Sequence, residues 1–183
     1  MNGVSGFADG VALRWENAPP RTRLMVGGLI AILIGMVGLT PKSFFGVTLA
    51  WPYVGLIAAV GWGRSGLRFG PMLFLLLFGF AQDASQAPWG SHGLANLLTY
   101  GFSAMVTQMV DTERTPLLSF LLPVVALFFG ITLVWIAASI SSGHVVRVTP
   151  LLTAYFATLV VHMLMASLFD LNAQRAAPGS GVI

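Results

Sequence analysis

The sequence predicts an all-α integral membrane protein with six transmembrane helices and both termini in the cytoplasm. Three observations lead to this prediction. Hydrophobic residues make up 56% of the 183-residue chain and charged residues only 8%, whereas a soluble domain carries about 25% charged side chains. The mean hydropathy is +0.85, and the apolar residues are gathered in runs separated by short polar stretches. The basic residues are also distributed unequally between alternate loops, as in membrane proteins.

Six apolar segments are expected to form one membrane domain over residues 21–171. They cover about 24–40, 48–63, 70–83, 89–110, 116–140 and 150–169. A straight span needs about 20 apolar residues, so the third segment either borrows residues from the preceding loop or stops inside the protein. Residues 1–20 and 172–183 are expected to be cytoplasmic tails. The second tail is expected to be flexible because it is polar and rich in Gly and Pro.

The basic residues determine the predicted orientation. With the N-terminus inside, two of them, Lys42 and Arg147, fall on the outer side. The other seven fall on the cytoplasmic side and are Arg14, Arg21, Arg23, Arg64, Arg68, Arg114 and Arg175. This bias follows the positive-inside rule and agrees with an even number of spans. The polar turn between the third and fourth segments then lies on the outer side.

The composition argues against several functional classes. A net charge of only +3, with no basic stripe interleaved with aromatic residues, argues against nucleic-acid binding. The absence of cysteine excludes thiolate catalysis and Cys-ligated metals. No G-x-S-x-G, P-loop or H-E-x-x-H motif occurs, and His92, His144 and His162 lack metal-ligand spacing. We therefore expect no catalytic residue, no metal site and no cofactor.

The polar turn contains Asp83, which is the only acidic residue between Glu16 and Asp111. An ionised Asp at the centre of a membrane helix costs about 3 kcal/mol, so such residues have partners or a role. We expect Asp83, at a helix end, to hold the hairpin by bonding to Ser85, to His92 or to the backbone N–H groups of the turn. A proton or ion pathway through Asp83 is the alternative.

The fourth segment carries a polar stripe. Its members share one helix face and are His92, Asn96, Thr99, Ser103 and Thr107. Lipid cannot satisfy these groups, so the face is expected to turn inward. There it either holds the bundle together or lines a ligand cavity.

The first segment carries a row of small residues, Gly27, Ala31 and Gly35, at intervals of four. Small residues in such a row let two helices approach closely in lipid. The row is expected to be a docking face for a partner's transmembrane helix or, alternatively, a packing face for the chain's own helices.

The polar turn also contains a motif that can be compared with known families. It reads Gly79-Phe-Ala-Gln-Asp83, then Pro88-Trp-Gly90-Ser-His92-Gly-Leu. This spacing resembles the signature of the MreD family of rod shape-determining membrane proteins, and the chain length and hydropathy profile are similar over about residues 20–170. The expected motif residues, with a structural role, are Gly79, Asp83, Gly90, His92 and Asn96.

The resemblance implies both a fold and partners. Members of this family are six-helix proteins of the bacterial inner membrane whose fold is similar to the S components of energy-coupling-factor (ECF) transporters. They bind MreC, which has one transmembrane helix, and through it connect to the RodA–PBP2 peptidoglycan synthase and to MreB filaments. The resemblance therefore implies a non-enzymatic scaffold in the lipid bilayer. The alternatives left open are a small-molecule-binding subunit of an ECF-type transporter and, for the scaffold, a homo-oligomer.

Overall fold

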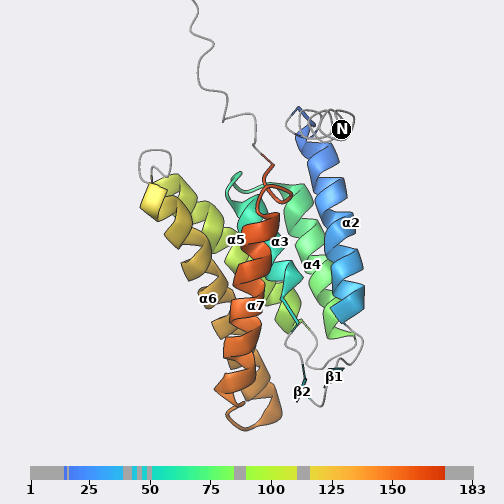
Figure 1. The fold of residues 1–183 in the computed structure, drawn as a ribbon, viewed down its shortest axis with the longest axis vertical. Coiled ribbons are helices and arrows are strands. Elements are labelled where there is room, and N and C mark those ends of the chain that lie inside the picture. Colours follow the sequence, from blue (N-terminus) through green and yellow to red (C-terminus); the bar gives the residue numbers. More distant parts are fainter. Residues whose placement is uncertain are drawn as a thin grey trace, which may run out of the picture.

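The computed structural model describes residues 15, 17–38, 43–44, 47–48, 51–84, 90–110 and 116–171. These residues form six helices and one pair of short strands (Figure 1). The helices are α2 (Pro20–Gly38), α3 (Val54–Gly63), α4 (Phe69–Asp83), α5 (Ser91–Met109), α6 (Pro116–Ser142) and α7 (Val148–Met165). The strands β1 (Ser43–Phe44) and β2 (Val47–Thr48) pair antiparallel. The described residues therefore form a helical bundle with a small hairpin at one end.

The helices agree with the predicted apolar segments in number and order, with one correction. The second segment was expected to be helical over 48–63, but α3 begins only at Val54 and the first residue of the segment belongs to β2. Pro52 has no N–H for a helical bond and restricts the residue before it. The N–H of Tyr53 is donated to the Thr158 hydroxyl of α7, at 3.0 Å. The helix is consequently short, and its start is tied to α7.

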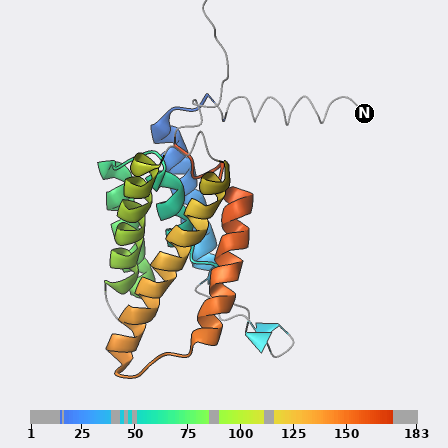
Figure 2. The same cartoon turned by 90° about the vertical axis from the view of Figure 1, so that its left-hand side faces the viewer.

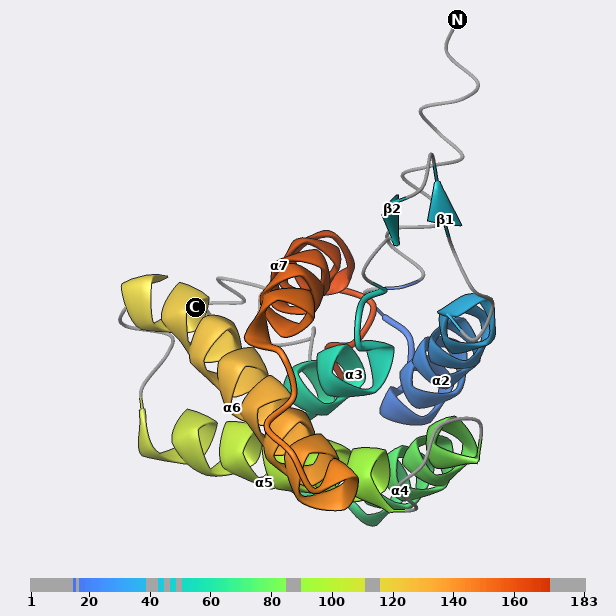
Figure 3. The ribbon, with the colours of Figure 1, turned by 90° about the horizontal axis from the view of Figure 1, so that it is seen from below.

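The short helix α3 lies inside the bundle. All ten of its residues are buried, and it contacts each of the other five helices. Figure 3, seen from below, shows it between α2, α4, α5, α6 and α7. Ten helical residues rise about 15 Å, whereas the hydrocarbon core of a bilayer is about 30 Å thick. On its own, α3 is therefore too short to cross a bilayer, and its surroundings are protein.

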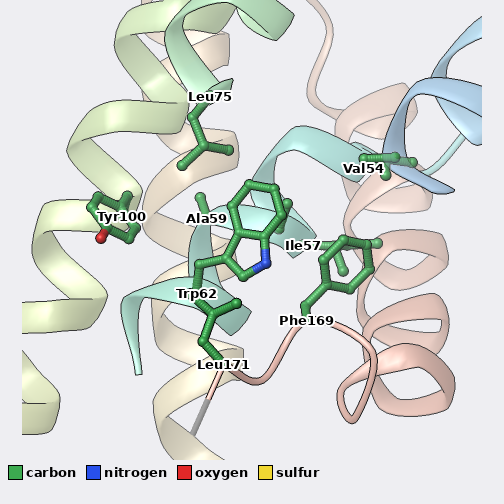
Figure 4. Close-up of a cluster of buried hydrophobic side chains, with 10 residues drawn as sticks. Val54, Ile57, Ala59, Trp62, Leu75, Tyr100, Phe169 and Leu171 are labelled. Atoms are coloured by element: carbon green, nitrogen blue, oxygen red, sulfur yellow. The ribbon is translucent and has the colours of Figure 1, made fainter. Parts of the chain in front are cut away.

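The hydrophobic core centres on Trp62, near the end of α3. Its side chain is fully buried, and its ring makes edge contacts with Phe74 of α4 and with Phe169, at centroid distances of 5.2 and 5.9 Å. Figure 4 shows Phe169 reaching this ring from the segment after α7. A second cluster joins α3 to α6 and contains Leu56, Val60, Ala126, Leu127 and Ile131.

The outer surface of the bundle is apolar on every described helix except α3. Exposed large hydrophobic side chains lie on these five helices, for example Leu33, Leu77, Leu98, Phe128 and Phe156. Three helices, α2, α6 from Leu117 onward, and α7, are long and apolar enough to cross a membrane, whereas α3 and α4 are apolar but shorter. These features are those of a helical membrane protein. That all six segments cross the bilayer remains a prediction.

The start of α2 and the end of α7 lie at the same end of the bundle (Figures 1 and 2). The turn between α6 and α7 lies at the opposite end (Figure 2). Most of the two predicted tails, residues 1–14 and 172–183, lies outside the described residues. Within the predicted N-terminal tail, Trp15 is held against the segment that follows α7, since its ring N–H donates to the Ser167 carbonyl at 3.2 Å.

Candidate functional site

Gly79 of α4 and Gly93 of α5 allow these two helices to touch. A Cβ placed on Gly79 would overlap the backbone N and Cα atoms of Gly93. A Cβ on Gly93 would lie 3.3 Å from the carbonyl oxygen of Leu76. Small residues permit this backbone-to-backbone approach in membrane helices. The contact brings the end of α4 beside the start of α5.

Asp83, one turn after Gly79, caps the start of α5. Its side chain is fully buried and accepts hydrogen bonds from Ser91 Oγ at 3.0 Å and from the backbone N–H of His92 at 3.1 and 3.2 Å. The N-cap position of α5 is Gly90, with φ of 89° and no side chain to accept these bonds. The first N–H groups of a helix need acceptors, and the helix dipole favours a carboxylate there. Asp83 therefore supplies from α4 the cap that α5 lacks.

His92 binds the same carboxylate through its ring. Nδ1 lies 2.6 Å from Asp83 Oδ1, and the ring stacks on Tyr53 at the start of α3, with centroids 6.0 Å apart. Since an ionised carboxylate only accepts, Nδ1 carries the hydrogen. Ser91 Oγ lies 3.5 Å from the same Nδ1, whereas a Ser–His–Asp nucleophile requires the serine at Nε2. The three side chains therefore do not form such a catalytic arrangement.

The polar stripe of α5 faces the interior and is used for packing. Asn96, Thr99 and Ser103 are buried. Ser103 Oγ donates to the Val60 carbonyl of α3 at 3.1 Å. Asn96 lies against Gly55 of α3, and its amide nitrogen is 3.5 Å from a carbonyl of α4. These contacts join α5 to α3 and α4, which favours the bundle-holding interpretation of the stripe.

The small residues of α2 mostly face the chain's own core, which corrects the predicted docking face. Gly27 and Ala31 are buried, and a Cβ on Gly27 would lie 3.5 Å from the rings of Phe169 and Trp62. These two residues are therefore inaccessible to a partner, because the row packs α2 closely against this core. Gly35 is partly exposed and lines an apolar groove of about 410 Å³ between α2 and α4.

Arg23, at the other end of the bundle, joins the start of α2 to distant backbone, a role that its place among the basic residues of the sequence does not predict. It is buried, and its guanidinium donates to the backbone carbonyls of Asp170 at 2.8 Å, Trp15 at 2.5 Å and Ala18 at 3.2 Å. Asp170 lies 147 residues further along the chain. No local sequence pattern points to this contact.

Tyr100 is a second anchor that was not predicted. Its hydroxyl donates to the Gly66 carbonyl at 2.8 Å and accepts from the backbone N–H of Arg68 at 2.7 Å. It thereby joins α5 to the loop between α3 and α4. A signal for this residue was present, since Tyr100 lies four residues after Asn96 and three before Ser103, on the face of the polar stripe.

The fold and the contact between α4 and α5 define a helical membrane protein in which a buried aspartate, Asp83, and a partly exposed histidine, His92, join two neighbouring helices. No protein-family model, curated protein or solved structure gives a significant match to the chain. Within the described part of the chain, no group of three or more His, Cys, Asp or Glu residues is placed to hold a metal ion.

Proposed function

We propose that the chain is a non-enzymatic scaffold of the bacterial cell-elongation machinery, of the MreD type, in the inner membrane. The observation that carries this proposal is that the motif residues lie together at the α4–α5 junction. These residues are Gly79, Asp83, Gly90 and His92. Their spacing is the basis of the resemblance to that family. Their contacts provide a physical reason for the spacing, because they join the end of α4 to the start of α5.

The proposed orientation places the start of α2 and the end of α7 in the cytoplasm, with six crossings in a bundle similar to S components. The described basic residues support it. Arg21 and Arg23 lie in the first turns of α2, Arg64 and Arg68 flank the loop from α3 to α4, and Arg147 precedes α7 at the opposite end. This distribution follows the positive-inside rule. The α4–α5 junction then faces the periplasm.

The proposed partner is MreC, whose transmembrane helix would lie in the groove between α2 and α4. Small residues favour close packing of helices in lipid, and both walls of the groove carry one, Gly35 on α2 and Ala81 on α4. The rest of the groove is almost wholly apolar and includes Ile32, Met36 and Leu77. Through MreC the scaffold would connect to RodA–PBP2 and to MreB.

The experiment is native mass spectrometry of the protein co-expressed with its genomic neighbours, comparing Ala81→Trp with Leu164→Trp. Ala81 is exposed and lines the groove, so a Trp there fills the groove. Leu164 is 78% exposed on α7 and serves as the control. A substitution at Gly35 is unsuitable, because its Cβ would lie 2.8 Å from the Phe78 ring.

We expect a complex with a single-span protein in the wild type and in Leu164→Trp, and its loss in Ala81→Trp at unchanged thermal stability. A complex that survives Ala81→Trp would place the interface elsewhere than in this groove. A protein that carries a bound small molecule and no single-span partner would favour the transporter-subunit alternative.

A further inference from the structure

We propose that the Asp83–His92 pair is a recognition site for a cationic hydrogen-bond donor, an ammonium or guanidinium group, which binds His92 Nε2. This inference goes beyond the scaffold role and does not depend on the identity of the scaffold's partners. It rests on the accessibility of Nε2, on the protonation pattern that Asp83 imposes, and on the charge of the pair.

Nε2 of His92 is accessible and makes no hydrogen bond to any described residue. The buried side-chain atoms without a partner in this part of the chain are Trp62 Nε1, Ser65 Oγ, Thr99 Oγ1 and His162 Nδ1. His92 Nε2 is not among them, and 13% of the His92 side chain is exposed. The polar contacts of the ring are all made by Nδ1, to Asp83 and Ser91. Nε2 therefore lies at the exposed edge of the junction.

Asp83 makes this exposed atom an acceptor. An ionised carboxylate can only accept, so across the 2.6 Å contact Nδ1 is the donor. When the ring is neutral, Nε2 then carries the free lone pair. A carboxylate bonded to one ring nitrogen fixes the tautomer and the orientation of an imidazole, as it does in metal sites. The stacked ring of Tyr53 holds the imidazole from one face. The acceptor is thus oriented before any ligand arrives.

The charge of the pair favours a cationic ligand. Asp83 is fully buried and lies 2.6 Å from His92 Nδ1, and no Lys or Arg of the described residues is bonded to it. With a neutral ring the pair carries one negative charge, which the N–H groups at the start of α5 offset only in part, because a helix N-terminus is equivalent to about half a positive charge. A cationic donor at Nε2 balances this charge and forms a charge-assisted bond, about twice as strong as a neutral one.

Capping of α5 does not by itself require the imidazole. Ser91 Oγ and the backbone N–H of His92 already bond to the two carboxylate oxygens. The ring adds a further bond whose main consequence is the orientation of Nε2. Two substitutions separate these roles: His92→Asn keeps an amide near the position of Nδ1 and removes Nε2, whereas His92→Gln places its amide near the position of Nε2.

The test uses the full chain, with ¹⁵N-labelled histidine, in phosphatidylcholine nanodiscs. The probe is N-acetyl-arginine amide, and its neutral isostere N-acetyl-citrulline amide is the matched control. We expect a saturable shift of the His92 Nε2 resonance, with half-saturation at an about tenfold lower concentration for the arginine probe. His144, in the exposed turn after α6, and His162, buried in α7, are internal controls. Their signals should not move.

The lipid itself is the second possible source of the cation. If the ammonium group of phosphatidylethanolamine is the natural ligand, nanodiscs of that lipid shift the same resonance without any added probe. A shift from either source supports the site and identifies what supplies the cation.

Three results would overturn the proposal. They are equal half-saturation by the two probes, no saturable shift in either lipid, and a His92 ring that is already doubly protonated without a ligand. The comparison between the two probes uses the wild-type chain, so it remains decisive if a variant does not fold. In folded His92→Asn we expect probe binding to be lost, and His92→Gln should restore part of it.

Discussion

Gly79 of α4 and Gly93 of α5 are in backbone contact, and this contact sets the distance over which Asp83 reaches the start of α5. An aspartate side chain is short, so it can cap a neighbouring helix only if the two backbones meet. The glycine pair, the buried carboxylate and the imidazole are therefore parts of one junction. A change at the glycine contact should disturb the other two.

Replacement of Gly79 by alanine should strongly destabilise the protein. The added Cβ would overlap the Gly93 backbone, which cannot move away without separating α4 from α5. Overpacking of this kind costs about 1–3 kcal/mol, measurable as a lower Tm in detergent. The control is Gly101→Ala in α5, where nothing lies within 4 Å of the new Cβ. That variant should be neutral or more stable by up to about 1 kcal/mol, and equal Tm values for the two variants would contradict the close contact.

Asp83→Asn should weaken the cap of α5 while preserving the side-chain volume. The amide keeps one oxygen and turns its NH₂ group toward donors of α5, so at least one buried hydrogen bond is lost. We expect a loss of about 1–3 kcal/mol. Ser91→Ala removes a single donor to the same carboxylate and should cost about 1 kcal/mol. The effects of the two should be non-additive in a double-mutant cycle, because both act on one network; strict additivity would argue against a shared carboxylate.

Tyr100→Phe should loosen the loop between α3 and α4. The substitution removes the hydroxyl that bonds to the Arg68 N–H and to the Gly66 carbonyl, at a cost of about 1–2 kcal/mol. Limited trypsin digestion provides the readout, since Arg64 and Arg68 lie at the two ends of this loop. Tyr155→Phe, which removes a hydroxyl bonded to α6, is the control. It should leave the cleavage rate at this loop unchanged. If both variants are cleaved at the wild-type rate, the Tyr100 hydroxyl does not hold the loop.

Arg23→Lys should release the start of α2 from the segment after α7. A guanidinium presents several donors in a fixed fork, whereas an ammonium is a compact charge, so lysine cannot reach all three carbonyls. We expect a loss of about 1–3 kcal/mol, seen as a lower Tm. Arg21→Lys is the matched control because Arg21 is exposed on the same helix, and it should stay within about 0.5 kcal/mol of the wild type. A wild-type Tm for Arg23→Lys would show that the three bonds add no stability.

The class of protein, the order of its helices and the inward face of α5 could be predicted from the sequence. Apolar runs determine which segments are expected to lie in the membrane. The spacing of Asn96 and Ser103 determines which face of α5 turns toward the interior of the bundle. Both properties are local, so they are present before the chain packs. The glycine at 79 and the acid at 83 could likewise be recognised as unusual within such runs.

Tertiary packing decided how each of these features is used. A row of small residues can pack against a helix of the same chain or of a partner. Only the packing of the bundle determines that Gly27 and Ala31 face the chain's own core while Gly35 borders a groove. Only the contact of α4 with α5 determines that Asp83 caps α5 and orients His92. The start of α3 and one of the three carbonyls that bind Arg23 depend on residues more than 100 positions away. Local sequence determines which groups must be satisfied, whereas the partner that satisfies each group is determined only when distant segments meet.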